Sequence, residues 1–413
     1  MAGTKIGIRP VMQRVSILMI MLITVETLLV SPALADIAKA FPDAAGSAIG
    51  MIMTMPFIPM VIMAAFITPQ LAKKFDKKTL ILVACVVYIF AGTAGAYLND
   101  SVGQLILMRA VLGIPLGITG PLCIAIINQL YTGLERKNMF GFANAVSSLL
   151  SIFLLLFAGW LAAQSWKYVF LSYLLFIIVL LLLAIFLPKL PAQVEEEGAS
   201  GKTKIVYTPK QKAKLTFVVL FAFAGLMCSF VIQVQTSFIV DEKGLGGAQL
   251  AALVISVFGI GQIISGFLYG VYSLIFKRFC LVLLPALIAL GCYIMFLATN
   301  VPMLIIGILV AGIGAGINNP LVNDKVTAIG PIQNGAFAGG LIMAATGIGV
   351  FLSVFMIDFY ALFVEPTAVN LIWCTVVMHI IITAIVLVYV LWNPFKGVNY
   401  VREDEQSIDT PSS

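Results

Sequence analysis

The sequence predicts an all-α membrane protein with twelve transmembrane helices in two pseudo-symmetric six-helix bundles. The first indication is composition, because 61% of the 413 residues are hydrophobic and only 10% are charged. A soluble protein does not cover so much apolar surface with so few charges, so the solvent of this chain is a lipid bilayer. The other two indications are an internal repeat and the distribution of lysine and arginine.

Twelve apolar runs are long enough to cross the hydrocarbon core as helices. The first follows basic residues, as a signal peptide would, but Glu26 in its middle is foreign to a signal core and eleven more spans follow. We therefore interpret it as a retained first helix. The predicted spans are 15–35, 47–71, 79–98, 103–131, 139–164, 166–188, 215–240, 249–275, 279–298, 302–323, 334–359 and 367–392.

The 24 lysines and arginines divide unequally between the two sides of these spans. Twenty lie on the side of the N-terminus, three on the opposite side, and Arg109 lies within a span. Because cytoplasmic segments are the basic ones, we expect both termini in the cytoplasm and a multi-pass, monomeric protein of the plasma membrane. The net charge of +6 is spread over short loops without forming a patch, which argues against nucleic acid as a partner.

The repeat links Leu105–Leu122 with Leu304–Leu321, 199 residues later, and 9 of the 18 aligned positions are identical. Four repeated glycines are expected to allow close helix packing and rocking of the halves: Gly113, Gly117, Gly312 and Gly316. A repeat at this distance indicates two similar halves. We expect an N-terminal half over 1–188, a cytoplasmic linker over 189–214, a C-terminal half over 215–393 and a cytoplasmic tail over 394–413.

Glu26 is the one carboxylate expected well inside a span, roughly 17 Å from the cytoplasmic end at 1.5 Å per residue. A lone carboxylate at that depth costs about 3 kcal/mol to insert, so it must face a cavity, find a partner or take up a proton. We interpret it as a reversible proton carrier. The alternative is a structural carboxylate that is hydrogen-bonded to neighbouring helices.

Arg109 is the natural counter-charge, since it lies within roughly one helical turn of the depth of Glu26. If the two side chains approach each other, protonation of Glu26 releases Arg109 and changes how the halves pack. Solute and proton would then compete for one carboxylate. The alternative is an arginine that only ties its helix to backbone carbonyls.

Amide side chains supply most of the other polar groups inside the spans. A lipid-facing amide is costly, so these side chains are expected to point inward. Each is either a solute contact or a hydrogen bond between helices. The candidate solute-binding residues are Asn144, Gln233, Gln235, Gln262, Asn318 and Asn319.

The sequence argues against enzymatic chemistry. It contains no GxSxG or HExxH motif, and a single histidine makes a metal cluster or a Ser/His/Asp triad implausible. The six cysteines lie in apolar runs without CxxC spacing, as small core residues do. We therefore expect no enzyme activity, no metal and no cofactor.

Several motifs resemble those of the major facilitator superfamily, and the likeness covers nearly the whole chain. Helix 1 ends in Ser31-Pro32-Ala33-Leu34, as the family's first helix does, and Ser165–Phe170 (SWKYVF) resembles the family's segment between helices 5 and 6. Arg109 with Gly113 and Gly117 resembles the family's helix-4 motif, whose arginine takes part in proton coupling. The resemblance implies a transporter with twelve helices in two halves.

Two departures from the family pattern affect what the resemblance implies. In the loop between helices 2 and 3, Lys73 replaces the family's aspartate and Asp76 its second glycine, so the charge latch between helices is expected to be altered. The helix-5 signature of drug antiporters is missing except for Ala158-Gly159. This absence weakens an assignment to the drug-antiporter branch.

These observations predict a secondary active transporter that works by alternating access, with small-molecule solutes, protons and the bilayer as its partners. The favoured hypothesis is proton-coupled export of small amphipathic compounds or drugs. An alternative is uptake or facilitated transport of a metabolite, such as an organic anion that docks on Arg109. A third is a transporter-like sensor, although the short linker and tail offer no signalling domain.

Overall fold

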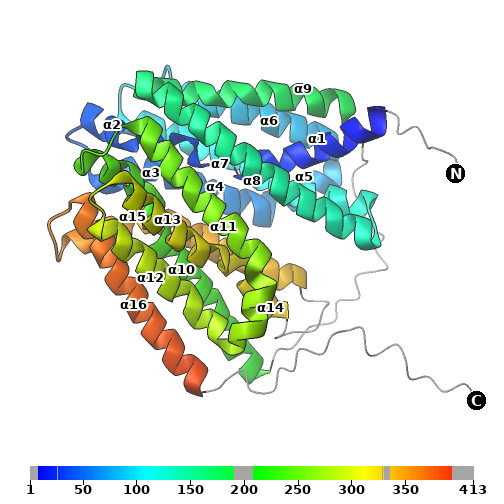
Figure 1. Cartoon of the computed structure of the whole chain (residues 1–413). Coiled ribbons are helices and arrows are strands. Elements are labelled where there is room, and N and C mark those ends of the chain that lie inside the picture. Colours follow the sequence, from blue (N-terminus) through cyan, green and yellow to red (C-terminus); the bar gives the residue numbers. More distant parts are fainter. Residues whose placement is uncertain (1–7, 26, 190–207, 328, 330–334, 393–413) are drawn as a thin grey trace, which may run out of the picture.

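The computed structural model describes residues 8–25, 27–189, 208–327, 329 and 335–392, and these residues form helices with no strand among them (Figure 1). The predicted all-α class is therefore confirmed. The first bundle contains α1 (Ile8–Val25), η1 (Leu28–Ala33), α2 (Leu34–Ala40), α3 (Gly46–Thr54), α4 (Phe57–Ile62), the π-helical η2 (Met63–Ile67), α5 (Thr68–Lys74), α6 (Lys77–Ala94), α7 (Val102–Leu130), α8 (Gly133–Gln164), η3 (Trp166–Leu175) and α9 (Phe176–Phe186). The second contains α10 (Pro209–Glu242), α11 (Ala248–Phe276), η4 (Lys277–Phe279), α12 (Cys280–Leu297), α13 (Val301–Gly316), α14 (Asn318–Thr327), α15 (Gly335–Ala361) and α16 (Ala368–Trp392).

Ten of the described helical segments are long and apolar enough to cross a membrane, and the bent pair Val11–Ile23 and Leu28–Ala40 makes an eleventh. One of the ten, Ala248–Leu297, contains both α11 and α12, which η4 separates. Each predicted span therefore falls on its own helical segment. Most of the predicted linker and the whole of the predicted tail lie outside the described residues. α10 begins at Pro209, within the predicted linker range.

The repeated helices begin with the same kind of cap, which extends the repeat beyond the identical residues. The Ser101 side chain accepts a hydrogen bond from Gln104 N at 3.3 Å and starts α7. The Asn300 side chain, 199 positions later, accepts one from Met303 N at 3.0 Å and starts α13. Each cap satisfies a backbone N–H that the first helical turn leaves unpaired.

The repeated glycines lie where helices of the same half come into backbone contact. A Cβ atom added at Gly113 would lie 2.2 Å from Pro56 O, and one at Gly312 would lie 2.4 Å from Phe258 O. One turn further, Gly117 and Gly316 approach the carbonyls of Met60 and Gln262 in the same way. The two bundles thus pack in the same way: α7 lies against α4 and η2 in the first bundle, and α13 lies against α11 in the second.

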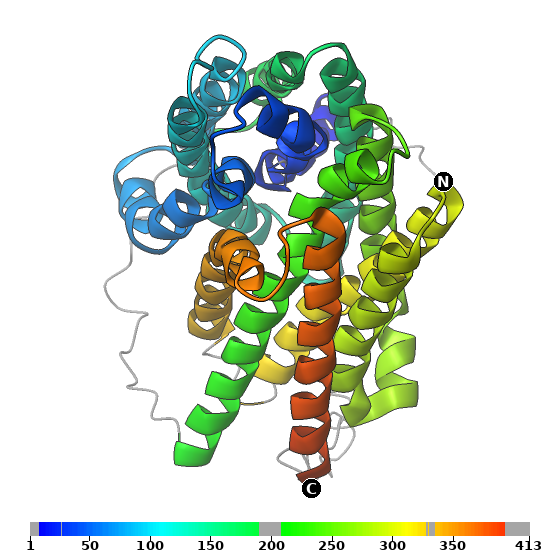
Figure 2. The same ribbon diagram turned by 90° about the vertical axis from the view of Figure 1, so that its left-hand side faces the viewer.

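The two bundles meet near one end of the molecule, which we call the closed end. There Lys39 of α2 forms an ion pair with Asp241 of α10, and a Cβ added at Gly159 of α8 would lie 2.2 Å from Ala252 Cβ of α11. At the opposite end, the open end, α1 begins and α16 ends, and the ribbons of the bundles diverge (Figure 1). Figure 2 shows the molecule from the closed end. Because the first helix begins and the last helix ends at the same end of the molecule, the chain between them runs from one end to the other an even number of times.

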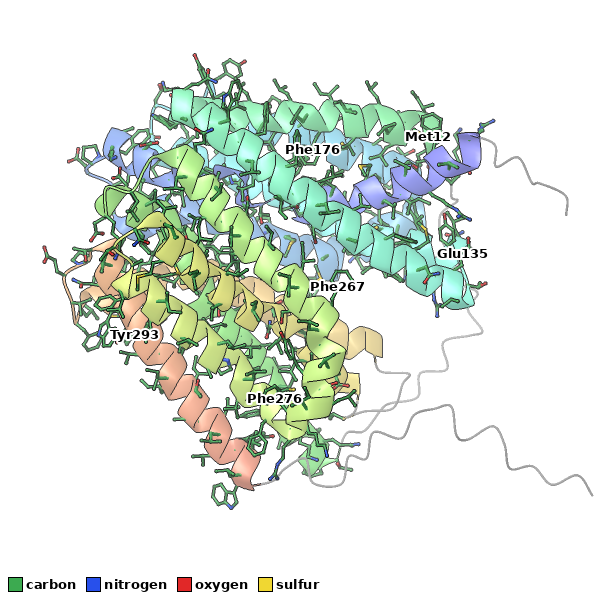
Figure 3. All side chains as sticks on the ribbon, in the orientation of Figure 1. Met12, Glu135, Phe176, Phe267, Phe276 and Tyr293 are labelled. Carbon is green, nitrogen blue, oxygen red and sulfur yellow. The ribbon has the colours of Figure 1, made fainter. Side chains whose placement is uncertain are left out.

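The outer surface carries large apolar side chains, as lipid contact requires. Phe267 is 79% exposed, and Phe276 and Tyr293 also lie on the outside of the second bundle (Figure 3). The buried polar side chains lie inside the bundles, with Arg109 only 1% exposed. This inside-out distribution is that of a protein whose solvent is hydrocarbon.

Candidate functional site

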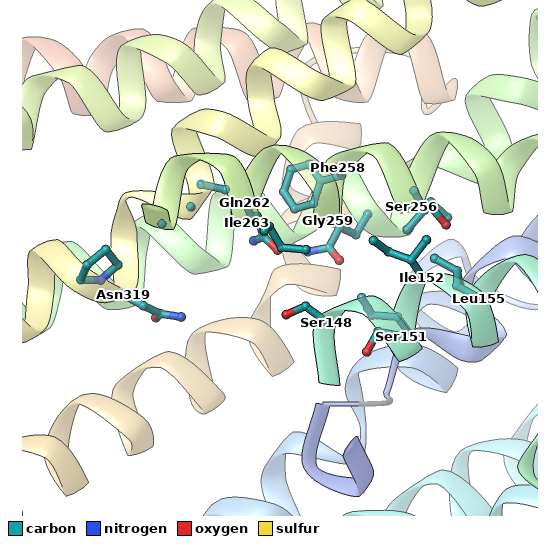
Figure 4. A pocket seen from close by; sticks show the side chains of 17 residues that line it. Ser148, Ser151, Ile152, Leu155, Ser256, Phe258, Gly259, Gln262, Ile263 and Asn319 are labelled. Carbon is teal, nitrogen blue, oxygen red and sulfur yellow. The ribbon is translucent and has the colours of Figure 1, made fainter. Parts of the chain in front are cut away.

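A cavity of about 380 Å³ lies between the two bundles and is lined by residues of both (Figure 4). The first half contributes Leu28 and one face of α8, and the second half contributes residues of α10, α11, α13 and α14. A volume of this size is in the range of small-molecule sites. Six lining side chains are polar and all six are uncharged: Ser148, Ser151, Gln233, Ser256, Gln262 and Asn319.

Helical spacing explains why α8 and α11 can form two opposite walls. On α8 the lining residues Ser148, Ser151, Ile152 and Leu155 recur at intervals of three and four. On α11 the lining runs from Ile255 to Gly266 with a similar period. Residues at such intervals share one helix face. The polar side chains of α8 therefore lie across the cavity from those of α11 and α14, as Figure 4 shows.

The cavity collects three of the predicted solute-binding residues, Gln233, Gln262 and Asn319. Two others, Gln235 and Asn318, are buried outside the lining at 4% and 5% exposure. Helical rotation accounts for this, because a neighbour one or two residues along a helix points about 100° or 200° away. The side chain of the sixth, Asn144, lies outside the described residues.

Arg109 does not line the cavity but is held inside the first bundle by three hydrogen bonds. Its Nε donates to Ile52 O at 2.7 Å, its Nη2 to Thr27 O at 2.6 Å and its Nη1 to Tyr173 Oη at 2.5 Å. The side chain thus joins the first, second and sixth spans to α7. Glu26, its expected counter-charge, lies outside the described residues, although the bonded Thr27 is the next residue in the chain.

Lys73 and Asp76, the two departures from the family's loop pattern, lie at the open end in and after α5. The Asp76 carboxylate accepts a hydrogen bond from Thr79 N at 3.1 Å and caps α6, which gives this acid a local role. Lys73 is exposed in the last turn of α5. Lys77, the first residue of α6, is fully buried, and its Nζ donates to Gln129 Oε1 at 2.6 Å, so it links α6 to α7.

Sequence reasoning missed the serines of the cavity and the partners of Arg109. Ser148 and Ser151 lie three residues apart on the fifth span, a spacing that would have placed them on one face. Serines attract little notice in apolar helices because the hydroxyl can bond to a carbonyl of its own helix, as Ser256 Oγ does with Ala252 O at 2.7 Å. No local pattern pointed to Tyr173, which meets Arg109 only through tertiary packing.

The model of the family described as Major Facilitator Superfamily matches residues 16–354 of the chain. Among solved structures, an inward-facing, unoccupied bacterial homologue of the human lysosomal transporter Spinster is similar at a TM-score of 0.70, with 16% identity, covering 92% of this chain and 96% of that one. A D-xylose-proton symporter is similar at 0.70 with 15% identity over 92% and 97%, respectively, and the nucleoside transporter NupG at 0.70 with 12% over 92% and 100%. No curated protein matches the sequence.

Proposed function

The chain belongs to the Major Facilitator Superfamily and is a membrane transporter rather than an enzyme, and from this premise we propose that protons drive the export of small amphipathic compounds through it. The cavity is the proposed solute site. It is lined by both halves, as a site that is exposed alternately to the two sides must be. Its mixed lining of aliphatic, hydroxyl and amide groups suits a solute with apolar and polar parts.

We propose Glu26 and Arg109 as the coupling pair. In support, Arg109 is almost completely buried and donates to the carbonyl of Thr27, the neighbour of Glu26. A buried guanidinium is costly without a compensating charge, and Glu26 is the acid nearest in sequence to the carbonyl that it bonds. Since Arg109 also bonds to Ile52 O and Tyr173, a change at Glu26 is transmitted to several helices of the first half.

We assign the open end to the cytoplasm of a monomeric plasma-membrane protein. The basic residues support this orientation, because they gather on the side where the first helix begins. The fold is also similar to that of a protein solved in an inward-facing state. The repeated glycines, with Lys73 and Asp76, are proposed to allow and limit the rocking between the two states.

Solute uptake is the second candidate, because the similar structures include a D-xylose-proton symporter and a nucleoside transporter. The specific version in which an organic anion docks on Arg109 has less support. All three nitrogens of that guanidinium donate to protein oxygens, and Arg109 is not among the residues that line the cavity. Uptake of an uncharged metabolite fits the lining better than uptake of an anion.

Transport in proteoliposomes tests the coupling and its direction together. With radiolabelled chloramphenicol as the probe, an antiporter accumulates it when the vesicle interior is acidic, and a proton symporter when the exterior is acidic. We expect accumulation with an acidic interior, its loss in Glu26→Gln, and its retention in the control Glu365→Gln, a substitution in the loop between α15 and α16. Undiminished gradient-driven transport by Glu26→Gln would overturn the proposed coupling.

A further inference from the structure

The hydrogen-bonding pattern of the repeated helix is continuous in the first half and interrupted in the second. α7 runs from Val102 to Leu130, whereas the pattern of its counterpart lapses at the single residue Ile317, between α13 and α14. Ile317 keeps helical dihedral angles, with φ −69° and ψ −25°, and Val301–Val322 runs as one span. The break lies where the two copies differ in sequence, Thr119-Gly120 against Asn318-Asn319. Within a bilayer, a backbone carbonyl that lacks its helical partner is tolerated only where protein buries it or a cavity borders it.

Both copies contain a proline that removes a backbone hydrogen bond. Pro121 has no N–H for the carbonyl four residues earlier, that of Gly117, and Pro320 has none for the carbonyl of Gly316. In the first half the deficit is repaired by a neighbouring helix, because Thr68 Oγ1 donates to Gly117 O at 2.8 Å in a buried position. The uninterrupted course of α7 is consistent with this repair.

In the second half no side chain of the described residues is seen to donate to the carbonyl of Gly316 as Thr68 donates to Gly117 O. The amide that follows the proline, Leu321 N, donates to Ile317 O at 3.0 Å. Ser265, whose Cβ would lie 2.8 Å from a Cβ added at Gly316, does not repair it either, since its buried Oγ has no hydrogen-bond partner. Gly316 lines the cavity, and a glycine presents only backbone there.

The polar side chains around the Gly316 carbonyl are uncharged. Asn319 and Gln262 line the cavity next to Gly316, from α14 and α11 (Figure 4). Across the cavity, Ser151 Oγ is buried and has no hydrogen-bond partner, so it too is available to a solute. No charged side chain is among the described lining residues, so a full charge on the solute would be left without a counter-charge.

We propose that the residues around the interruption between α13 and α14 recognise the solute in the cavity, and that this solute is uncharged and carries hydroxyl or N–H donors. The Gly316 carbonyl accepts one of these hydrogen bonds, and Asn319 and Gln262 supply partners on either side. This inference rests on the proposed function and adds the class of solute. On this inference, hydrophobic cations and organic anions are not preferred solutes.

The repeat supplies a matched pair of variants for the test. Pro320→Ala restores an N–H that can bond to Gly316 O and so removes the acceptor from the solute. Pro121→Ala makes the same change in the first half, where Thr68 already serves Gly117 O. Equilibrium binding to the purified full chain is measured at one constant pH. The uncharged probes are chloramphenicol and uridine, and the charged probes are tetraphenylphosphonium as an organic cation, benzoate as an anion and sodium chloride as a source of a small cation.

We expect at least one uncharged probe to bind, with its affinity reduced about tenfold or more in Pro320→Ala and in Asn319→Ala and by less than twofold in Pro121→Ala. The Asn319 variant keeps the test decisive if Pro320→Ala fails to fold. Preferred binding of tetraphenylphosphonium, benzoate or sodium, or equal effects of the two proline variants, would overturn the inference. Because no gradient is applied, failure here leaves the proton-coupling proposal standing, and failure of Glu26→Gln to block transport leaves this one standing.

Discussion

The two copies of the repeated helix, α7 and α13 with α14, share their packing and differ in their polar chemistry. Both begin at a side-chain cap, both place glycines against the carbonyls of a neighbouring helix, and both carry a proline near the middle of the bundle. Yet α7 holds the buried Arg109 where α13 has the buried Ile308. The cavity, in turn, draws most of its polar lining from the second half. The shared features hold each bundle together, and the differences divide charge and solute recognition between the two.

The largest expected effect comes from making the first copy resemble the second by Arg109→Ile. The substitution leaves Ile52 O, Thr27 O and Tyr173 Oη without their buried donor. Buried polar groups left unpaired cost about 1–3 kcal/mol each, so we expect a loss of roughly 3–5 kcal/mol in the free energy of unfolding. Thermal unfolding in detergent measures it. A variant as stable as the parent would show that the arginine network contributes little to the first half.

The next effect tests whether the repeated glycines are equivalent. Alanine at Gly312 or at Gly113 forces a methyl group against a backbone carbonyl, and we expect each to lower the free energy of unfolding by about 1–3 kcal/mol. Gly141→Ala on α8 is the control, since a Cβ there meets nothing within 4 Å. It should stabilise the helix by up to about 1 kcal/mol. A destabilised Gly141→Ala, or unchanged Gly312→Ala, would contradict the packing described here.

A smaller effect sharpens the difference between the two prolines. Thr68→Val removes the donor to Gly117 O while keeping the shape of the side chain, and we expect a loss of about 1–2 kcal/mol in unfolding free energy. Ser265→Ala, its control in α11, removes a hydroxyl with no hydrogen-bond partner and should change stability by less than about 0.5 kcal/mol. Equal losses from both variants would mean that Ser265 serves Gly316 as Thr68 serves Gly117.

The smallest expected effect concerns the ion pair at the closed end. Lys39 and Asp241 are 59% and 40% exposed, and exposed pairs contribute about 0–1 kcal/mol. Lys39→Gln should therefore shift the balance between the two access states by no more than about fivefold, and salt should weaken the effect. Labelling rates of a cysteine introduced into the cavity from the closed-end side report that balance. A shift of a hundredfold would assign this pair a dominant role that its exposure does not predict.

The sequence predicts the helical architecture of this chain well because the bilayer imposes it. Each of the twelve apolar runs has to form a helix, and the 199-residue offset relates the halves down to the caps Ser101 and Asn300. Interruptions within spans were less predictable. Along the second span, the regular helix is interrupted between α3, α4, η2 and α5, where Pro56 and Pro59 lack a backbone N–H, and along the tenth it is interrupted at Ile317.

The site was predictable in kind more than in detail. Buried amides point inward on general grounds, and Gln233, Gln262 and Asn319 do line the cavity. The sequence does not separate Gln233 from Gln235, because the direction that faces the other half is decided by packing. No sequence motif marks the carbonyl of Gly316, because its proposed role depends on a proline four residues later and on the packing of α11 against it.

α8 and α11 come into close contact at Gly159 and Ala252. They touch at the closed end and carry the cavity walls further along, with Ser148 about 16 Å from Gly159 at 1.5 Å per residue. A rotation of about 10° at that crossing therefore displaces the wall by roughly 3 Å, the width of a water molecule. Because Gly159 has no side chain, it lets α8 and α11 approach this closely, and a Cβ added there would lie 2.2 Å from Ala252 Cβ.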